Sequence, residues 1–160
     1  MRGVALFVAG LITGLAAHVA IAQNANDGVV MMNHVAVVVP NLTEAVTHYT
    51  QKMGYREAFR ALDANGQPRL VYLHISRNTF LELQPATAQR PAGVNHYGLH
   101  VEDVAGTVAR FRRAGLTVTD VNRSDTGALL ANVTDPYMGR IELAQLPPDS
   151  MHQKAIASWR

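Results

Sequence analysis

The sequence predicts an α+β fold in which two βαβββ modules pair around a central cleft. Residues 33–39 begin with Asn-His and have the apolar character of a β-strand, and residues 95–101 repeat this pattern 62 positions later. A helical pattern follows each copy, and each half closes with a strand-like segment containing Glu-Leu. A unit of roughly 55 residues cannot cover both faces of its own sheet, so the two units are expected to share one core.

In the first half, apolar or aromatic residues recur with helical spacing after the first predicted strand, at Leu42, Ala45, Val46 and Tyr49. Asn41 and Glu44 form a capping box before this helix, and Gly54 ends it. Strands are then predicted at residues 56–62, 69–76 and 79–84, separated by turn-forming residues.

The second half repeats this order. Asp103 is the predicted N-cap of a helix whose inward positions are Val104, Thr107, Val108 and Phe111, and Gly115 ends it. Strands are predicted at residues 117–122, 128–134 and 141–146.

The two ends of the chain have patterns of their own. Residues 1–22 are predicted to be a cleaved signal peptide, with Arg2 before an apolar stretch and Ala20-Ile21-Ala22 at the cleavage site. An uncleaved membrane anchor is the alternative. The further divisions are a linker at 23–31, modules at 32–86 and 94–146 joined by a linker at 87–93, and a helical tail at 147–160. The tail's apolar stripe is expected to pack on the protein's own sheet, with a homodimer contact as the alternative.

Composition excludes several classes of function. Of the 160 residues, 48% are hydrophobic and 16% are charged, which is typical of a folded globular protein. The absence of cysteine excludes disulfides, thiolate metal sites and cysteine nucleophiles. A net charge of +2 without basic runs gives no support to nucleic-acid binding.

One histidine and one glutamate recur in each half. His34 and His96 lie in the first strands, and Glu82 and Glu142 lie in the otherwise apolar last strands, where an unpaired charge would be costly to bury. Two imidazoles and two carboxylates suit a divalent first-row metal ion such as Ni, Zn, Mn, Co or Fe. His100 shares a strand face with His96 at roughly 13 Å, so it is assigned to the substrate pocket, with a hydrogen-bonded core histidine as the alternative.

These residues carry a resemblance to a known family. The duplicated pattern, with VNHYGLHVED at 94–103 and DPYMGRIEL at 135–143, resembles the vicinal oxygen chelate superfamily, and the resemblance covers residues 32–146. The superfamily includes glyoxalase I, methylmalonyl-CoA epimerase, extradiol dioxygenases and the fosfomycin and bleomycin resistance proteins. The resemblance implies a glyoxalase-like fold and a ligand set closest to that of glyoxalase I, on His34, Glu82, His96 and Glu142.

The resemblance also implies a reaction. The expected function is that of an exported lyase or isomerase that moves a proton on a small oxygen-chelating substrate through a metal-stabilised enediolate, with Glu82 or Glu142 as the base. Glyoxalase I has an arginine four residues after its first histidine, and this chain has Val38 there, so glutathione binding is not expected. The alternatives are a non-catalytic ligand-sequestering protein of the bleomycin-resistance type and an extradiol-type dioxygenase.

Export can be tested on the protein directly. A periplasmic or secreted protein that touches the membrane only through its signal peptide is expected to begin at Gln23 after cleavage. Mass spectrometry of the exported protein measures its first residue, and an intact Met1 would support the membrane anchor instead.

Overall fold

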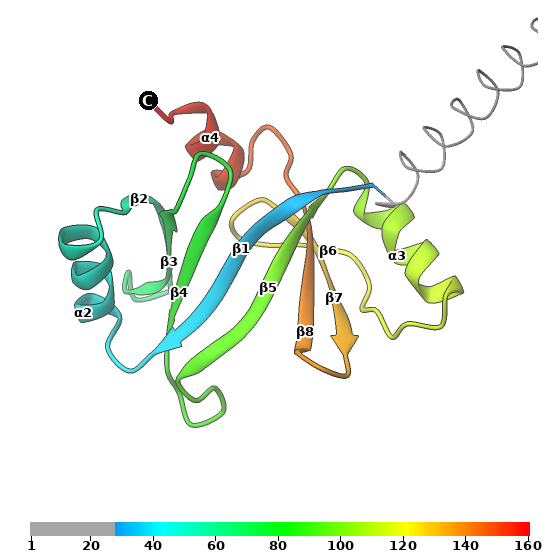
Figure 1. Cartoon of the computed structure of the whole chain (residues 1–160), viewed down its shortest axis with the longest axis horizontal. Coiled ribbons are helices and arrows are strands. Elements are labelled where there is room, and N and C mark those ends of the chain that lie inside the picture. Colours follow the sequence, from blue (N-terminus) through cyan, green and yellow to red (C-terminus); the bar gives the residue numbers. More distant parts are fainter. Residues whose placement is uncertain (1–27) are drawn as a thin grey trace, which may run out of the picture.

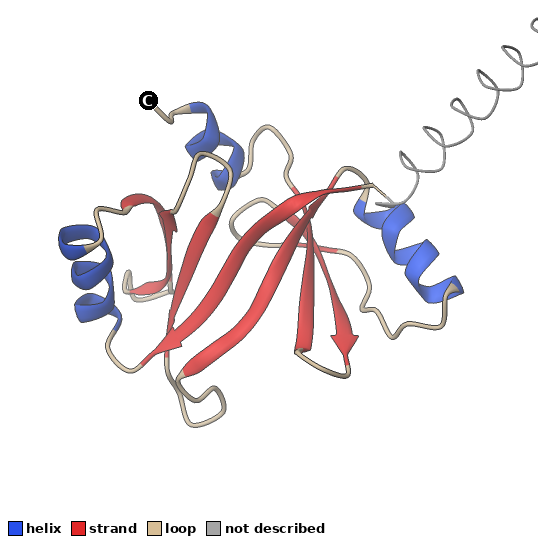
Figure 2. Ribbon diagram, in the orientation of Figure 1, coloured by secondary structure: helices blue, strands red, loops and turns tan. Residues whose placement is uncertain are grey.

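The computed structural model describes residues 28–160, which form a curled eight-stranded sheet with three α-helices and a short π-helix (Figures 1 and 2). The strands are ordered β2-β3-β4-β1-β5-β8-β7-β6 across the sheet. The elements are β1 (Val29–Val39), α2 (Leu42–Thr47), η1 (His48–Lys52), β2 (Arg56–Leu62), β3 (Pro68–His74), β4 (Phe80–Pro85), β5 (Gly93–Val101), α3 (Val104–Arg113), β6 (Asn122–Arg123), β7 (Leu129–Asp135), β8 (Gly139–Gln145) and α4 (Met151–Ala157).

The two halves of the sheet have the same topology, which confirms the predicted α+β fold of two paired βαβββ modules. In each half the first strand pairs in parallel with the last one, β1 with β4 and β5 with β8. The first strands of the two halves, β1 and β5, pair with each other in antiparallel orientation. This central pair therefore brings equivalent positions of the two modules together.

Helices α2 and α3 cover one face of the sheet, which we call the outer face (Figure 1). Leu42, Ala45 and Val46 of α2 pack on a buried cluster from β3 and β4 that includes Leu73 and Leu83. Val104, Val108 and Phe111 of α3 pack in the same way on the second half, against Ala131 and Leu143. The apolar face predicted for each helix is thus the face that it buries.

The C-terminal helix α4 lies against the opposite, inner face and contacts both halves. Ala155 packs with Leu70 and Phe80 of the first half, and Ile156 also contacts a cluster around Ala144 and Leu146 of the second half. Ser150 caps the helix by accepting a hydrogen bond from the backbone N–H of Gln153. The tail therefore packs on the protein's own sheet, as predicted.

Three local features differ from the prediction. β1 begins at Val29, inside the stretch predicted to be a linker. The first helix becomes π-helical after Thr47, where Thr50 donates a hydrogen bond to the carbonyl of Val46 at 2.8 Å. The strand predicted at residues 117–122 is wrong except at its end, because Arg112 donates two hydrogen bonds to the Val118 carbonyl and only a single bridge joins Val118 to Val133.

The signal peptide predicted at residues 1–22 lies outside the described residues, as does most of the linker after it. Among the described helices, none has the length and apolar character needed to cross a membrane.

His152 of α4 is buried in an unusual way. Its ring lies among Phe59, Tyr72 and Phe80 with centroid distances of 4.8, 4.7 and 5.7 Å. Neither ring nitrogen has a hydrogen-bond partner within residues 28–160. Burial lowers the pKa of His152 from 6.5 to about 3, because a charged imidazolium would lose its hydration.

We expect His152→Leu to make the protein less sensitive to acid. The unfolded chain takes up a proton at His152 below its ordinary pKa of 6.5 and the folded protein does not until about 3, so stability falls as the pH decreases between these values. At about pH 5 the lowered pKa of His152 reduces the free energy of unfolding by about 2 kcal/mol. Urea unfolding at about pH 7.5 and pH 5 measures this difference, with the exposed His48→Leu as control. Equal acid sensitivity in wild type and His152→Leu would refute the assignment.

Candidate metal centre

Four titratable side chains meet on the inner face at the seam between the modules. His34 extends from β1, His96 from β5, Glu82 from β4 and Glu142 from β8. The strand register explains the convergence, because Ala36 of β1 pairs with both Glu82 and His96, while Gly98 of β5 pairs with both His34 and Glu142. All four residues are at most 8% exposed.

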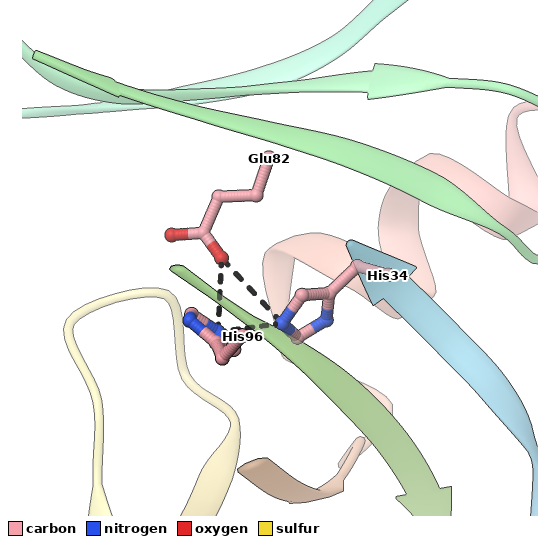
Figure 3. A group of neighbouring side chains, drawn as sticks. All are labelled: His34, Glu82 and His96. Atoms are coloured by element: carbon pink, nitrogen blue, oxygen red, sulfur yellow. Dashed lines mark hydrogen bonds and ion pairs between the residues drawn. The ribbon is translucent and has the colours of Figure 1, made fainter. Parts of the chain in front are cut away.

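The donor atoms are spaced like the ligands of one ion (Figure 3). The Nε2 atoms of His34 and His96 lie 3.1 Å apart, and Oε2 of Glu82 lies 3.5 and 3.6 Å from them. Donors bound at about 2.0 to 2.2 Å in a four- or six-coordinate shell are roughly 3 to 3.5 Å from one another. His34, Glu82 and His96 therefore form a group that fits one metal ion.

Glu142 approaches the same point less closely. Its Oε1 lies 3.6 Å from Nε2 of His34, while its Oε2 lies 3.9 Å from Nε2 of His96. The two contacts use different oxygens, and Glu142 lies outside the group that the other three residues form. A small change in side-chain torsion would bring one oxygen into a shared shell.

Gly98 provides the space for the His34 ring. A Cβ atom placed on Gly98 would lie 2.1 Å from Cε1 of His34 and 2.5 Å from its Nδ1. The equivalent position of the first module is Ala36, which is fully buried. The sequence therefore needs a small residue two positions after each histidine, and Gly is required at the second one.

An asparagine precedes each histidine and fixes its ring. Oδ1 of Asn33 lies 3.0 Å from Nδ1 of His34, and Oδ1 of Asn95 lies 2.8 Å from Nδ1 of His96. An amide oxygen can only accept a hydrogen bond, so Nδ1 of His34 carries the proton and its Nε2 presents a lone pair at the seam. At His96 the Arg140 guanidinium, which can only donate, also lies against Nδ1, so Asn95 and Arg140 favour opposite tautomers of this ring. Such partners fix the tautomer of metal-binding histidines.

Both imidazoles are neutral at physiological pH. Burial lowers the pKa of His34 to about 3, and burial together with the nearby His34 lowers the pKa of His96 to about 2. The guanidinium of Arg140 acts in the same direction on both rings. Neutral imidazole is the form that binds a metal ion.

The two glutamates have different surroundings. Glu82 accepts hydrogen bonds on both oxygens, from the Tyr72 hydroxyl at 2.8 Å and from Nε2 of Gln84 at 2.5 Å. For Glu142, no hydrogen-bond donor is found among residues 28–160, and its only close polar contacts are with the two ring nitrogens at 3.6 and 3.9 Å. Glu82 is thus held in one orientation by hydrogen bonds, whereas Glu142 is not.

The electrostatic environment of the glutamates follows from burial and charge. Burial raises the pKa of both carboxyls, and the negative charge of Glu82 raises that of Glu142 further, to about 7. Arg140 opposes both shifts. Its Nη2 donates to Oδ1 of Asn95 at 2.6 Å and lies against Nδ1 of His96, so the cation sits directly behind the second histidine.

A cavity of about 420 Å³ opens on the centre and spans both modules. A volume of this size suits a small organic ligand. Its polar lining includes Glu82, His96 and Glu142 from the centre, Gln84, Asn95 and Arg140 from beside it, Arg69, Ser124, Asp125 and Thr126 at its far wall, and Gln89 and Arg90 from the connection between the modules.

The structure brings together the four residues that the sequence singles out as metal ligands. His100, assigned to the substrate pocket, lies further along β5 and does not line this cavity, so its role stays a prediction. Sequence reasoning missed a second set of residues that bond to the four ligands: Asn33, Tyr72, Gln84, Asn95 and Arg140. The repeated Asn-His pair could have identified the two asparagines, whereas Tyr72 and Gln84 belong to no pattern that recurs in the sequence.

The donor set fits a divalent first-row metal. Two neutral imidazole nitrogens with carboxylate oxygens are borderline ligands, which favour Ni, Zn, Mn, Co or Fe over the all-oxygen sites of calcium and magnesium. His34, His96 and Glu82 would hold the ion, and Glu142 is placed to join them or to face a substrate.

Comparisons with known proteins agree with this geometry. The family model described as glyoxalase/bleomycin resistance protein/dioxygenase superfamily matches residues 33–131. Among curated proteins, none matches the chain. Methylmalonyl-CoA epimerase from Mycobacterium tuberculosis is similar in structure, with a TM-score of 0.66 and 18% identity over 76% of this chain and 91% of that one.

Two further solved structures share the fold. A Streptomyces coelicolor methylmalonyl-CoA epimerase variant in complex with 2-nitronate-propionyl-CoA has a TM-score of 0.63 and 19% identity, over 73% of this chain and 97% of that one. A hypothetical protein from Bacillus halodurans has a TM-score of 0.60 and 14% identity, over 72% and 94% of the two chains. The expected closeness to glyoxalase I stays a prediction, because the named enzymes among these matches are epimerases.

Gly98→Ala is expected to disrupt the centre without unfolding the protein. The added methyl group overlaps the His34 ring, which must rotate away from the seam, and metal affinity should fall by about 10-fold or more. Titration with Co or Zn followed by elemental analysis measures this loss. Ala36→Gly, at the equivalent position of the first module, is the matched control and should keep its metal; normal affinity in Gly98→Ala would show that the ring does not need this space.

Proposed function

Because the chain belongs to the glyoxalase/bleomycin resistance protein/dioxygenase superfamily, we propose that it is a metal-dependent enzyme of the isomerase or lyase type. It moves a proton on a small substrate that offers two adjacent oxygens. The observation that carries this proposal is the unequal environment of the two carboxylates, one fixed by hydrogen bonds and one unrestrained, at the floor of a shared cavity.

The fixed carboxylate acts as a ligand. Tyr72 and Gln84 hold both oxygens of Glu82, so its Oε2 stays aimed at the two Nε2 atoms. A divalent ion bound there supplies Lewis-acid stabilisation of negative charge on the substrate's oxygens. Asn33 keeps the His34 imidazole in the tautomer that this role needs.

The unrestrained carboxylate acts as the base. Glu142 lines the cavity, has two oxygens within 3.9 Å of the ring nitrogens and can turn toward a bound molecule. A carboxylate held in a buried site is a stronger base than one in water, which suits the removal of a proton next to a carbonyl. Burial and the neighbouring Glu82 raise its pKa to about 7.

The comparisons support a proton-transfer reaction over other chemistry. The similar solved structures include epimerases that are named for methylmalonyl-CoA. Val38 is 2% exposed and offers no charge to a glutathione carboxylate, so the glutathione hemithioacetal of methylglyoxal should be a poor substrate. Export, to the periplasm or as a secreted protein, is a further part of this proposal.

Exchange of hydrogen for deuterium tests the proposed base. The metal-loaded protein should exchange the C–H next to the carbonyl of a 2-oxo acid or 2-hydroxy ketone in heavy water, as followed by NMR. Glu142→Gln should slow this exchange by about 100-fold or more and keep its metal. Glu82→Gln should instead weaken metal binding by about 10-fold. The exposed Glu102→Gln is the control for both.

Two results would contradict this proposal. Unchanged exchange in Glu142→Gln would remove this residue from the reaction. A metal-loaded wild-type protein that binds such compounds tightly and exchanges no proton would favour the ligand-sequestering alternative.

A further inference from the structure

The cavity above the metal centre is lined by charged residues in addition to the candidate metal ligands. Six of its lining residues carry charge: three arginines, Arg69, Arg90 and Arg140, and three acids, Glu82, Asp125 and Glu142. These charges cancel when every group is ionised, and a divalent ion then leaves the cavity with a charge of about +2. An anionic ligand would therefore be attracted into it.

The three arginines differ in how they are engaged. Arg69 forms an ion pair with Asp125 at 2.5 Å across the two modules. Arg140 is bonded to Asn95 and lies against His96 at the centre. Arg90 has no carboxylate partner within residues 28–160, and its Nη2 donates only to the Pro85 carbonyl, at 3.1 Å. Arg140 has no carboxylate partner in this part of the chain either, but it is held at the centre, so Arg90 is the lining cation without a carboxylate partner that lies outside the centre.

Arg90 also has an unused donor. Its Nε atom is buried and has no hydrogen-bond acceptor in the part of the chain that the structure describes. Buried N–H groups of charged side chains are rarely left without an acceptor, since the desolvation cost is then not offset. The bond from Nη2 to the Pro85 carbonyl holds the guanidinium of this lining residue in place.

Another lining residue of this cavity, Gln84, also has an unpartnered atom. Gln84 is 8% exposed, and because its Nε2 donates to Glu82, its Oε1 points elsewhere and accepts no hydrogen bond from the described residues. One orphaned donor and one orphaned acceptor in a single cavity indicate a site that a ligand completes.

The backbone explains why Arg90 is fixed there. The segment between β4 and β5 forms a tight loop in which Thr87 and Arg90 exchange backbone hydrogen bonds at 3.0 and 3.1 Å. The Thr87 hydroxyl accepts a further bond from the backbone N–H of Arg90 at 3.1 Å. The connection between the modules, which the sequence predicts as a linker, is therefore a wall of the cavity.

We propose that Arg90 binds a carboxylate of the substrate, distinct from the adjacent oxygens that face the metal centre. The substrate is accordingly a chelating acid with a second, distal carboxylate, and Arg90 is a specificity-determining residue. This inference rests on the proposed function, because the chelating end of the molecule is placed by the metal centre.

Matched pairs of 2-oxo acids test the inference. Each pair has the same chain with and without a distal carboxylate: oxaloacetate with 2-oxobutanoate, 2-oxoglutarate with 2-oxopentanoate, and 2-oxoadipate with 2-oxohexanoate. Calorimetric titration of the metal-loaded protein should show, for at least one pair, about 10- to 100-fold tighter binding of the diacid.

Variants identify the residue responsible for that preference. Arg90→Gln should remove the preference and leave metal content and the affinity for the monoacid unchanged, whereas Arg90→Lys, which keeps the charge and loses Nε, should retain part of it. The exposed Arg113→Gln is the control and should behave like wild type. The inference is overturned if the preference for the diacid persists in Arg90→Gln. It is also overturned if wild type shows no such preference in any pair, which includes the case that no acid binds.

The same titrations separate this inference from the proposed function. Monoacid binding that requires the metal, with no diacid preference, refutes the role of Arg90 and leaves the metal-dependent reaction intact. Equal binding of the monoacids by metal-free and metal-loaded protein would refute the chelating role on which the proposed function depends.

Discussion

The antiparallel pairing of β1 with β5 is the constraint on which the rest of the structure depends. It places Ala36 opposite His96 and Gly98 opposite His34, so that two imidazoles from different modules meet with their Nε2 atoms 3.1 Å apart. The parallel neighbours β4 and β8 then add one carboxylate from each side. A shift of one residue in this register would turn one of the two histidines to the outer face, where α2 and α3 pack, and so separate it from the other.

The neighbouring side chains give the two halves of a nearly symmetric centre different chemical roles. Tyr72 and Gln84 bond to Glu82, and the second module has no such donors for Glu142. Arg140, in turn, stands behind His96 only. Duplication therefore supplies a pair of ligands from each module, whereas substitutions after duplication separate a fixed ligand from a carboxylate that is able to accept a proton.

The sequence predicts most of the fold and the four central residues, since both depend on a repeated pattern. The helices at 42 and 104 follow from apolar spacing and caps, and the His and Glu positions follow from their recurrence in equivalent strands. The irregular segment at 117–122 could not be predicted, because it depends on Arg112 bonding to a strand carbonyl. Tyr72, Gln84 and Arg90 could not be assigned either, as their roles exist only once distant segments share a cavity.

X-ray absorption spectroscopy of the protein loaded with Co or Ni tests the central claim most directly. It counts the imidazole nitrogens bound to the ion and measures their distance. The structure predicts one ion per chain with two imidazole ligands at about 2.0 to 2.1 Å and oxygen atoms in the other positions. A spectrum with no imidazole ligand, or one that is unchanged when His34 and His96 are both replaced, would contradict it.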